Sequence, residues 1–187
     1  MGLVQVATNT VTSAVASVTL TGIDSSDVYM VAYNNQVPAT DGTNLNIRFT
    51  VSGTGDSSSN YDRAFKKLSA TSSYSNQTST NQNLLRVSSQ NTGTGTSESG
   101  NGIIYLYNFN NSSEYSFITS EETIIGSTQS FSGNMGGGVL TENQSNDGIE
   151  FIMSSGNIAS GTFTLYRCVW NEWIWIHTRS TRTKFWK

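Results

Sequence analysis

The chain has 187 residues and a formal net charge of −3 at pH 7, and only 12% of its residues are charged, against roughly 25% in an ordinary globular domain. This length allows one domain with a sizeable core, or one domain with an appendage. A single cysteine excludes an internal disulfide framework, and no apolar run approaches the ~18 residues needed to span a membrane. Polar chains rich in Ser, Thr, Asn and Gly are often disordered, but here the aromatic and branched residues cluster in short alternating runs, which favours a folded all-β protein.

Alternation of apolar and polar residues with a period of two predicts short strands along most of the chain. The clearest example runs from Leu45 to Val51, where apolar residues alternate with polar ones as in a half-buried strand. In 103–109 the residues Ile103, Tyr105, Tyr107 and Phe109 alternate along one side, after an Asn-Gly pair that favours a hairpin turn. In chain order the predicted strands are 15–20, 28–33, 45–51, 103–109, 115–118, 123–125, 149–153 and 162–166.

Clusters rich in Gly, Ser and Asn separate these strands and predict turns or loops. Pro38, the only proline, is expected to fix a turn before the strand at 45–51. The stretch 61–70 fits either a short helix or a strand, and residues 1–13 fit either a first strand or an attachment arm. Many short strands between turn signals predict an antiparallel β-sandwich. The predicted turn-rich clusters are 53–60, 71–83, 91–100, 133–138 and 154–161.

Three segments resemble a known family. The runs 33–42 (YNNQVPATDG), 45–53 (LNIRFTVSG) and 158–166 (IASGTFTLY) are similar to segments of small structural proteins of tailed phages, particularly marine ones. The resemblance spans most of residues 15–166, and its motifs are structural. It implies a virion protein of fibre, knob or decoration type, assembled in the host cytoplasm, with a jelly-roll-like sandwich and an oligomeric state for which a trimer is favoured. Members of that family tend to end soon after the position of Tyr166, whereas this chain continues to Lys187.

The composition changes at Tyr166. All four tryptophans and the only histidine lie beyond it. Five basic residues and one acid give 167–187 a net charge of +4, and five basic residues and twelve acids give 1–166 a net charge of −7. We therefore predict a β-sandwich body over 1–166 and a C-terminal aromatic and basic tail over 167–187 that serves in assembly or anchoring.

The tail could pack against one of several surfaces. Trp173 and Trp175 alternate with Ile174 and Ile176, so both faces of a strand there would be apolar and would need cover. The cover is either the chain's own body, or a neighbouring subunit or another virion protein. Trp and Arg are enriched where interfaces concentrate their binding energy. The predicted interface residues are Trp170, Trp173, Ile174, Trp175, Ile176, Arg179, Arg182, Phe185 and Trp186.

Phosphate contacts with nucleic acid, or a position on a bilayer surface, are weaker alternatives for this tail. A net charge of +4 is small for a surface that binds nucleic acid or an anionic membrane, and the body is acidic. We therefore expect neither nucleic acid nor a membrane as a partner. A recent change of reading frame would also explain the tail's unusual composition.

The sequence shows no catalytic constellation. His177 is the only imidazole, and no GxSxG elbow marks an activated serine. Glu121 and Glu122 are adjacent, so on a strand they point to opposite faces and cannot share a substrate. Cys168 is expected to be an inert packed thiol. The glycine-rich run 133–138 lacks the lysine of a phosphate loop, and a bend or a close backbone approach between chains explains it better. We therefore predict a non-enzymatic protein without cofactor or metal.

The alternative function is a receptor-binding module. Tyr61 and Tyr74, with the Asn- and Ser-rich segments around them, could stack on and hydrogen-bond to host surface glycans. The expected partners are therefore further copies of the chain, other virion proteins and, under the alternative, host glycans.

Overall fold

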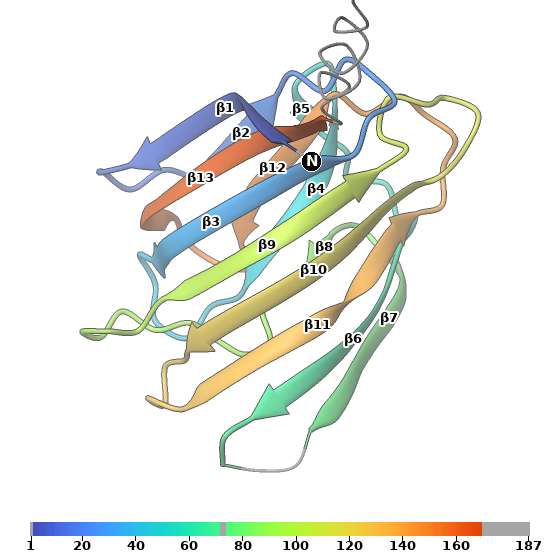
Figure 1. The fold of residues 1–187 in the computed structure, drawn as a ribbon. Coiled ribbons are helices and arrows are strands. Elements are labelled where there is room, and N and C mark those ends of the chain that lie inside the picture. Colours follow the sequence, from blue (N-terminus) through green and yellow to red (C-terminus); the bar gives the residue numbers. More distant parts are fainter. Residues whose placement is uncertain (1, 72–73, 170–187) are drawn as a thin grey trace, which may run out of the picture.

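A computed structural model describes residues 2–71 and 74–169, and within them the fold is all-β (Figure 1). The strands form two antiparallel sheets. The larger sheet has the order β1-β13-β3-β9-β10-β11-β6-β7, and the smaller has the order β2-β12-β4-β5, with β8 also paired to β4. The antiparallel β-sandwich predicted from the sequence is confirmed. The strand bounds are β1 Gly2–Val11, β2 Ser17–Thr21, β3 Tyr29–Pro38, β4 Leu45–Val51, β5 Thr54–Gly55, β6 Tyr61–Ser69, β7 Ser75–Gln82, β8 Leu85–Arg86, β9 Gly100–Tyr107, β10 Ser116–Ile125, β11 Phe131–Leu140, β12 Gly148–Met153 and β13 Ile158–Val169.

Aromatic side chains join the two sheets. Phe163 of the larger sheet packs on Phe151 of the smaller, with ring centroids 4.8 Å apart. Tyr61 meets Phe49 edge-on at 5.4 Å, and Phe109 packs on the same Phe49 ring at 4.5 Å. All five side chains are buried, and aromatic pairs of this kind contribute roughly 0.5–1.5 kcal/mol each beyond the area they bury. These contacts fix the spacing and orientation of the sheets.

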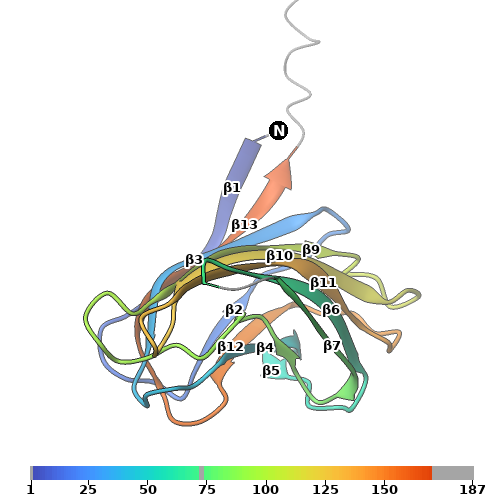
Figure 2. The same cartoon turned by 90° about the horizontal axis from the view of Figure 1, so that it is seen from below.

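The larger sheet arches over the smaller one, so that it has a concave inner face and a convex outer face (Figure 2). The smaller sheet lies beneath the middle of the arch, and β6 and β7 extend beyond it (Figure 2). Residues 86–91, which we call the strap, cover the inner face on that side. Its carbonyl groups accept hydrogen bonds from side chains of β6, β7 and β11.

Both ends of the described chain lie together at one edge of the larger sheet. β1 pairs with β13 from Gly2 opposite Val169 to Val11 opposite Gly161. The N-terminal residues therefore form a first strand. β13 continues three residues beyond Tyr166, so the change in composition falls inside a strand and not at its end.

Several local predictions are wrong or need correction. The run 133–138, predicted as a turn, lies inside β11, and the predicted loop 71–83 contains β7. The segments 115–118 and 123–125 belong to one strand, β10. The stretch 61–70 is a strand and not a helix. Pro38 is the last residue of β3, paired with Ile158, and the turn follows it.

Close backbone approach explains the glycines of β11. A Cβ on Gly133 would lie 2.8 Å from the carbonyl oxygen of Glu122, and one on Gly137 would lie 2.8 Å from that of Ile118. A Cβ on Gly136 would collide with the carbonyl oxygen of Ala64 and would lie 2.6 Å from the Cα of Phe65. The approach is thus between neighbouring strands of one chain.

We predict that Gly136→Ala lowers the free energy of unfolding by about 1–3 kcal/mol, because the added methyl group meets rigid backbone and forces the strands apart. Gly100→Ala is the matched control, since its nearest neighbour is the side-chain oxygen of Gln36 at 3.3 Å. Urea unfolding of both variants checks this, and equal losses of stability would contradict it.

Candidate functional site

The convex face of the larger sheet carries an apolar surface. Leu68, Ile103, Phe117, Phe131 and Met135 all point outward and are 40–49% exposed. They lie on the four adjacent strands β9, β10, β11 and β6, so they form one continuous area. Contiguous exposed apolar areas on soluble proteins mark interaction sites or aggregation hazards. We call this area the convex patch; it comprises Leu68, Ile103, Tyr105, Tyr107, Phe117, Phe131, Met135 and Val139.

Strand register sets the shape of the convex patch. Phe117 lies between Tyr107 and Val139, and Glu121 lies between Ile103 and Met135. The row between these two has a glycine, Gly137, opposite Thr119. Apolar side chains therefore project on either side of a gap.

Two hollows result from the outward-facing glycines. One, of about 560 Å³, lies around Gly133 and is lined by Leu68, Phe131 and Met135. The other, of about 390 Å³, lies around Gly137 beside Phe117. A surface with both apolar projections and apolar hollows can interlock with a partner of the same kind.

The inner face beneath this area carries a buried carboxylate. Glu121 is exposed, whereas Glu122 points inward and is 4% exposed, so the prediction that the two point to opposite faces of a strand is confirmed. One oxygen of Glu122 accepts the backbone N–H of Ser89 at 2.6 Å, and the other accepts the hydroxyl of Tyr33 at 3.5 Å. Burial raises the pKa of Glu122 to about 7, although the Ser89 hydrogen bonds and the charge of Arg86 act in the opposite direction.

The strap is held by side chains of the larger sheet. Arg63 donates to the carbonyl of Arg86, and Asn134 donates to that of Val87, each at 2.8 Å. Gln77 donates to the carbonyl of Ser89 at 2.8 Å. Since buried backbone groups without partners are costly, these bonds let a non-strand segment lie against the inner face.

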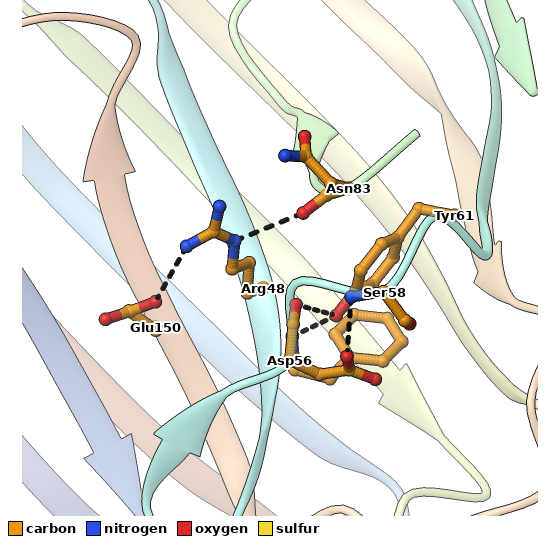
Figure 3. A network of polar contacts seen from close by, with 7 residues as sticks. Arg48, Asp56, Ser58, Tyr61, Asn83 and Glu150 are labelled. Atoms are coloured by element: carbon orange, nitrogen blue, oxygen red, sulfur yellow. Dashed lines mark hydrogen bonds and ion pairs between the residues drawn. The ribbon is translucent and has the colours of Figure 1, made fainter. Parts of the chain in front are cut away.

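The prediction that Tyr61 contacts a glycan is wrong. Its side chain is fully buried, and its hydroxyl accepts the N–H of Phe49 at 3.0 Å and donates to the carbonyl of Asp56 at 3.1 Å. Figure 3 shows this ring beside the ion pair of Arg48 and Glu150. The residue is a structural link between the sheets, and burial raises the pKa of its phenol.

Tyr74 is the accessible member of the predicted pair. It is 65% exposed, and the Lys66 ammonium group lies 4.4 Å from the centroid of its ring. Tyr74 is not among the residues that line the hollows on the convex face or beside the strap. Tyr74 therefore stays a possible contact without a site built around it.

The predicted tail interface and His177 lie outside the described residues, and their role stays a prediction. Cys168 is buried, as predicted for a packed thiol. Asp24 accepts the Tyr29 hydroxyl and Asp27 pairs with Arg167, so these loop acids hold local structure. Among the described residues no cluster of His, Cys, Asp and Glu could hold a metal ion. The predicted interface residues concerned are Trp170, Trp173, Ile174, Trp175, Ile176, Arg179, Arg182, Phe185 and Trp186.

Sequence reasoning missed the convex patch, although its signal is visible in the run 103–107, IIYLY. Both sides of this strand are apolar: Ile104 and Leu106 face the core, and Ile103 and Tyr105 face outward. A strand that is apolar on both sides within a chain this polar indicates that both faces meet a partner.

Comparison of the chain with protein-family models, with curated proteins and with solved structures found no match in any of the three. The resemblance to phage structural proteins therefore stays a prediction. The described part of the chain has no helix that could cross a membrane.

We predict that Glu122 makes stability depend on pH. The folded protein binds the Glu122 proton more tightly than the unfolded chain, whose pKa is near 4.5. This contribution is fully present below about pH 4.5 and is lost as pH rises through 7. A shift of this size corresponds to about 3 kcal/mol.

Glu122→Gln removes the titration and keeps an acceptor for the Ser89 N–H. We expect the variant to be more stable than the wild type at pH 8 and to lose less stability between pH 5 and 8, as measured by urea unfolding. Glu121→Gln, on the exposed side, is the control. A wild-type pH slope retained in Glu122→Gln would show that another group is responsible.

Proposed function

We propose that this chain is a non-enzymatic structural protein of a tailed-phage virion, a decoration, knob or fibre subunit that assembles with further copies of itself. The convex patch is the observation that supports assembly, and the family resemblance provides the biological setting. Under this proposal the protein needs no cofactor, and other virion proteins are its further partners.

A second copy of the chain is the partner that best fits the convex patch. Projecting side chains such as Phe117 and Met135 are matched in kind by the hollows around Gly133 and Gly137. One row also carries opposite charges: Glu121 and Lys66 flank Met135 from either side. A surface that carries both signs of charge, and both projecting side chains and hollows, can be complementary to itself, as contacts between identical subunits require.

The described chain also ends on the side that bears the patch. Figure 2 shows the start of β1 and the end of β13 rising from the convex side of the arch. This placement is compatible with the predicted interface role of the tryptophan-rich tail.

The alternative function, recognition of host glycans by tyrosine-bearing loops, is weakened because Tyr61 is buried. Tyr74 alone does not make a site.

We predict that the full chain is a defined oligomer and that Phe117→Ser combined with Met135→Ser lowers its mass toward that of the monomer. The two serines remove apolar contact area without filling the hollows. Leu3→Ser combined with Val51→Ser is the control, because these side chains are 49% and 40% exposed outside the patch. Light scattering at equal concentrations measures the masses, and a dimer or a trimer is distinguished directly.

A chain ending at Val169 separates the tail from the patch. The end is placed there because β13 pairs with β1 up to that residue. If the patch variant keeps the wild-type mass and only the shortened chain dissociates, the tail and not the convex patch joins the subunits. If the patch variant, the shortened chain and the full chain are all monomers, self-assembly is contradicted.

A further inference from the structure

The inner face near β6 and β7 gathers most of the positive charge of the body. Residues 1–166 contain five basic residues. Three of them, Arg63, Lys67 and Arg86, meet where the strap crosses this end of the sheet. Arg63 and Lys67 point inward from β6 because they alternate with outward-facing Ala64 and Lys66.

A hollow of about 370 Å³ opens beside these cations, a volume within the range of small-molecule sites. Lys67 and Arg86 line it, together with amide and hydroxyl groups of neighbouring loops. Its walls include none of the aromatic rings that stack on nucleic-acid bases. The polar residues that line it include Gln77, Gln90, Ser127 and Thr128.

No carboxylate pairs with these cations within the described residues, whose ion pairs are Arg48–Glu150 and Arg167–Asp27. Arg86 donates only its Nε, to the carbonyl of Ser88, and Lys67 makes a long contact of 3.5 Å to Gln90. Burial and the charge of Arg63 lower the pKa of Arg86, and the charge of Glu122 acts in the opposite direction. Half-buried positive charges without a direct ion-pair partner are costly, and an anion in the hollow would relieve that cost.

Amide and hydroxyl groups complete the lining of the hollow. Gln77 donates its Nε2 to the carbonyl of Ser89, and its Oε1 is buried without a hydrogen-bond partner among the described residues. Gln90, Ser127 and Thr128 line the same hollow. Amide and hydroxyl groups both donate and accept hydrogen bonds, so they suit the hydroxyl groups of a ligand.

We infer that this hollow binds an acidic saccharide. Lys67 and the free Nη atoms of Arg86 hold the carboxylate, and Gln90, Ser127 and Thr128 bond the ring hydroxyls. Charge-assisted hydrogen bonds to both cations supply affinity, and the amide and hydroxyl groups supply recognition of the sugar. The site lies on the inner side of the sheet, so it is independent of assembly through the convex patch.

The test is calorimetric titration of the full chain with oligogalacturonate, with a neutral galactose oligomer and inorganic sulfate as comparison probes. We expect saturable binding of oligogalacturonate that weakens with added salt, and markedly weaker binding of the other two. Lys67→Gln should lower the affinity by about tenfold or more. Lys66→Gln makes the same change of charge at the next residue, on the opposite face, and should leave the affinity unchanged.

Several results would overturn the inference. These are no saturable binding of oligogalacturonate, equal binding of sulfate, equal binding of the neutral oligomer, or the same loss of affinity in Lys66→Gln and Lys67→Gln. Thermal unfolding of both variants shows that they are folded. The patch variant Phe117→Ser/Met135→Ser should still bind the saccharide with wild-type affinity, so failure of the assembly proposal and failure of this inference are distinguishable.

Discussion

An eight-stranded sheet cannot be covered on its inner face by a sheet of five strands. The strap covers the remaining area and is held by hydrogen bonds from side chains to its backbone. Arg63, Gln77 and Asn134 each satisfy one strap carbonyl, and Glu122 accepts the N–H of Ser89. Without them, a non-strand segment in this position would bury unpaired backbone groups at a cost of roughly 1–3 kcal/mol each. The polar character of the interior at this end, and with it the hollow beside Lys67, follows from this covering.

The other half of the interior uses a different solution. There the two sheets face each other directly, and Phe49, Phe151 and Phe163 fill the space between them. Curvature around this core leaves the opposite face of the larger sheet convex and without a covering layer among the described residues. Its exposed apolar side chains, such as Phe117 and Met135, therefore provide apolar area that a partner can bury.

The sequence predicted the elements whose patterns are local. The strand at Leu45–Val51 agrees residue for residue with β4, because one side of it is apolar and the other polar. β7, in contrast, has no apolar residue; it is a strand because β6 pairs with it, a long-range cause that composition does not show. The glycines of β11 predict a turn, because the conformational freedom of glycine is visible in the sequence, whereas the close neighbouring strands that require these glycines are not.

The same limit applies to function. Tyrosine is a common residue type at binding surfaces, yet the hydroxyl of Tyr61 forms hydrogen bonds with the N–H of Phe49 and the carbonyl of Asp56 inside the core. The cations of the hollow come from β6 and β8, its amides from β7 and the strap, and two of its hydroxyl groups from the loop between β10 and β11, so no short motif could have brought them together. The run 103–107, which is apolar on both sides of its strand, is a local sequence signal of the convex patch.

Hydroxyl-radical footprinting of the full chain over a concentration series tests assembly through the convex patch most directly. Met135 and Phe117 are 49% and 43% exposed in the single chain, and Tyr74 is 65% exposed outside the patch. The account predicts that oxidation of Met135 and Phe117 falls as the protein associates while oxidation of Tyr74 stays constant. Association that leaves the oxidation of Met135 and Phe117 unchanged would contradict it.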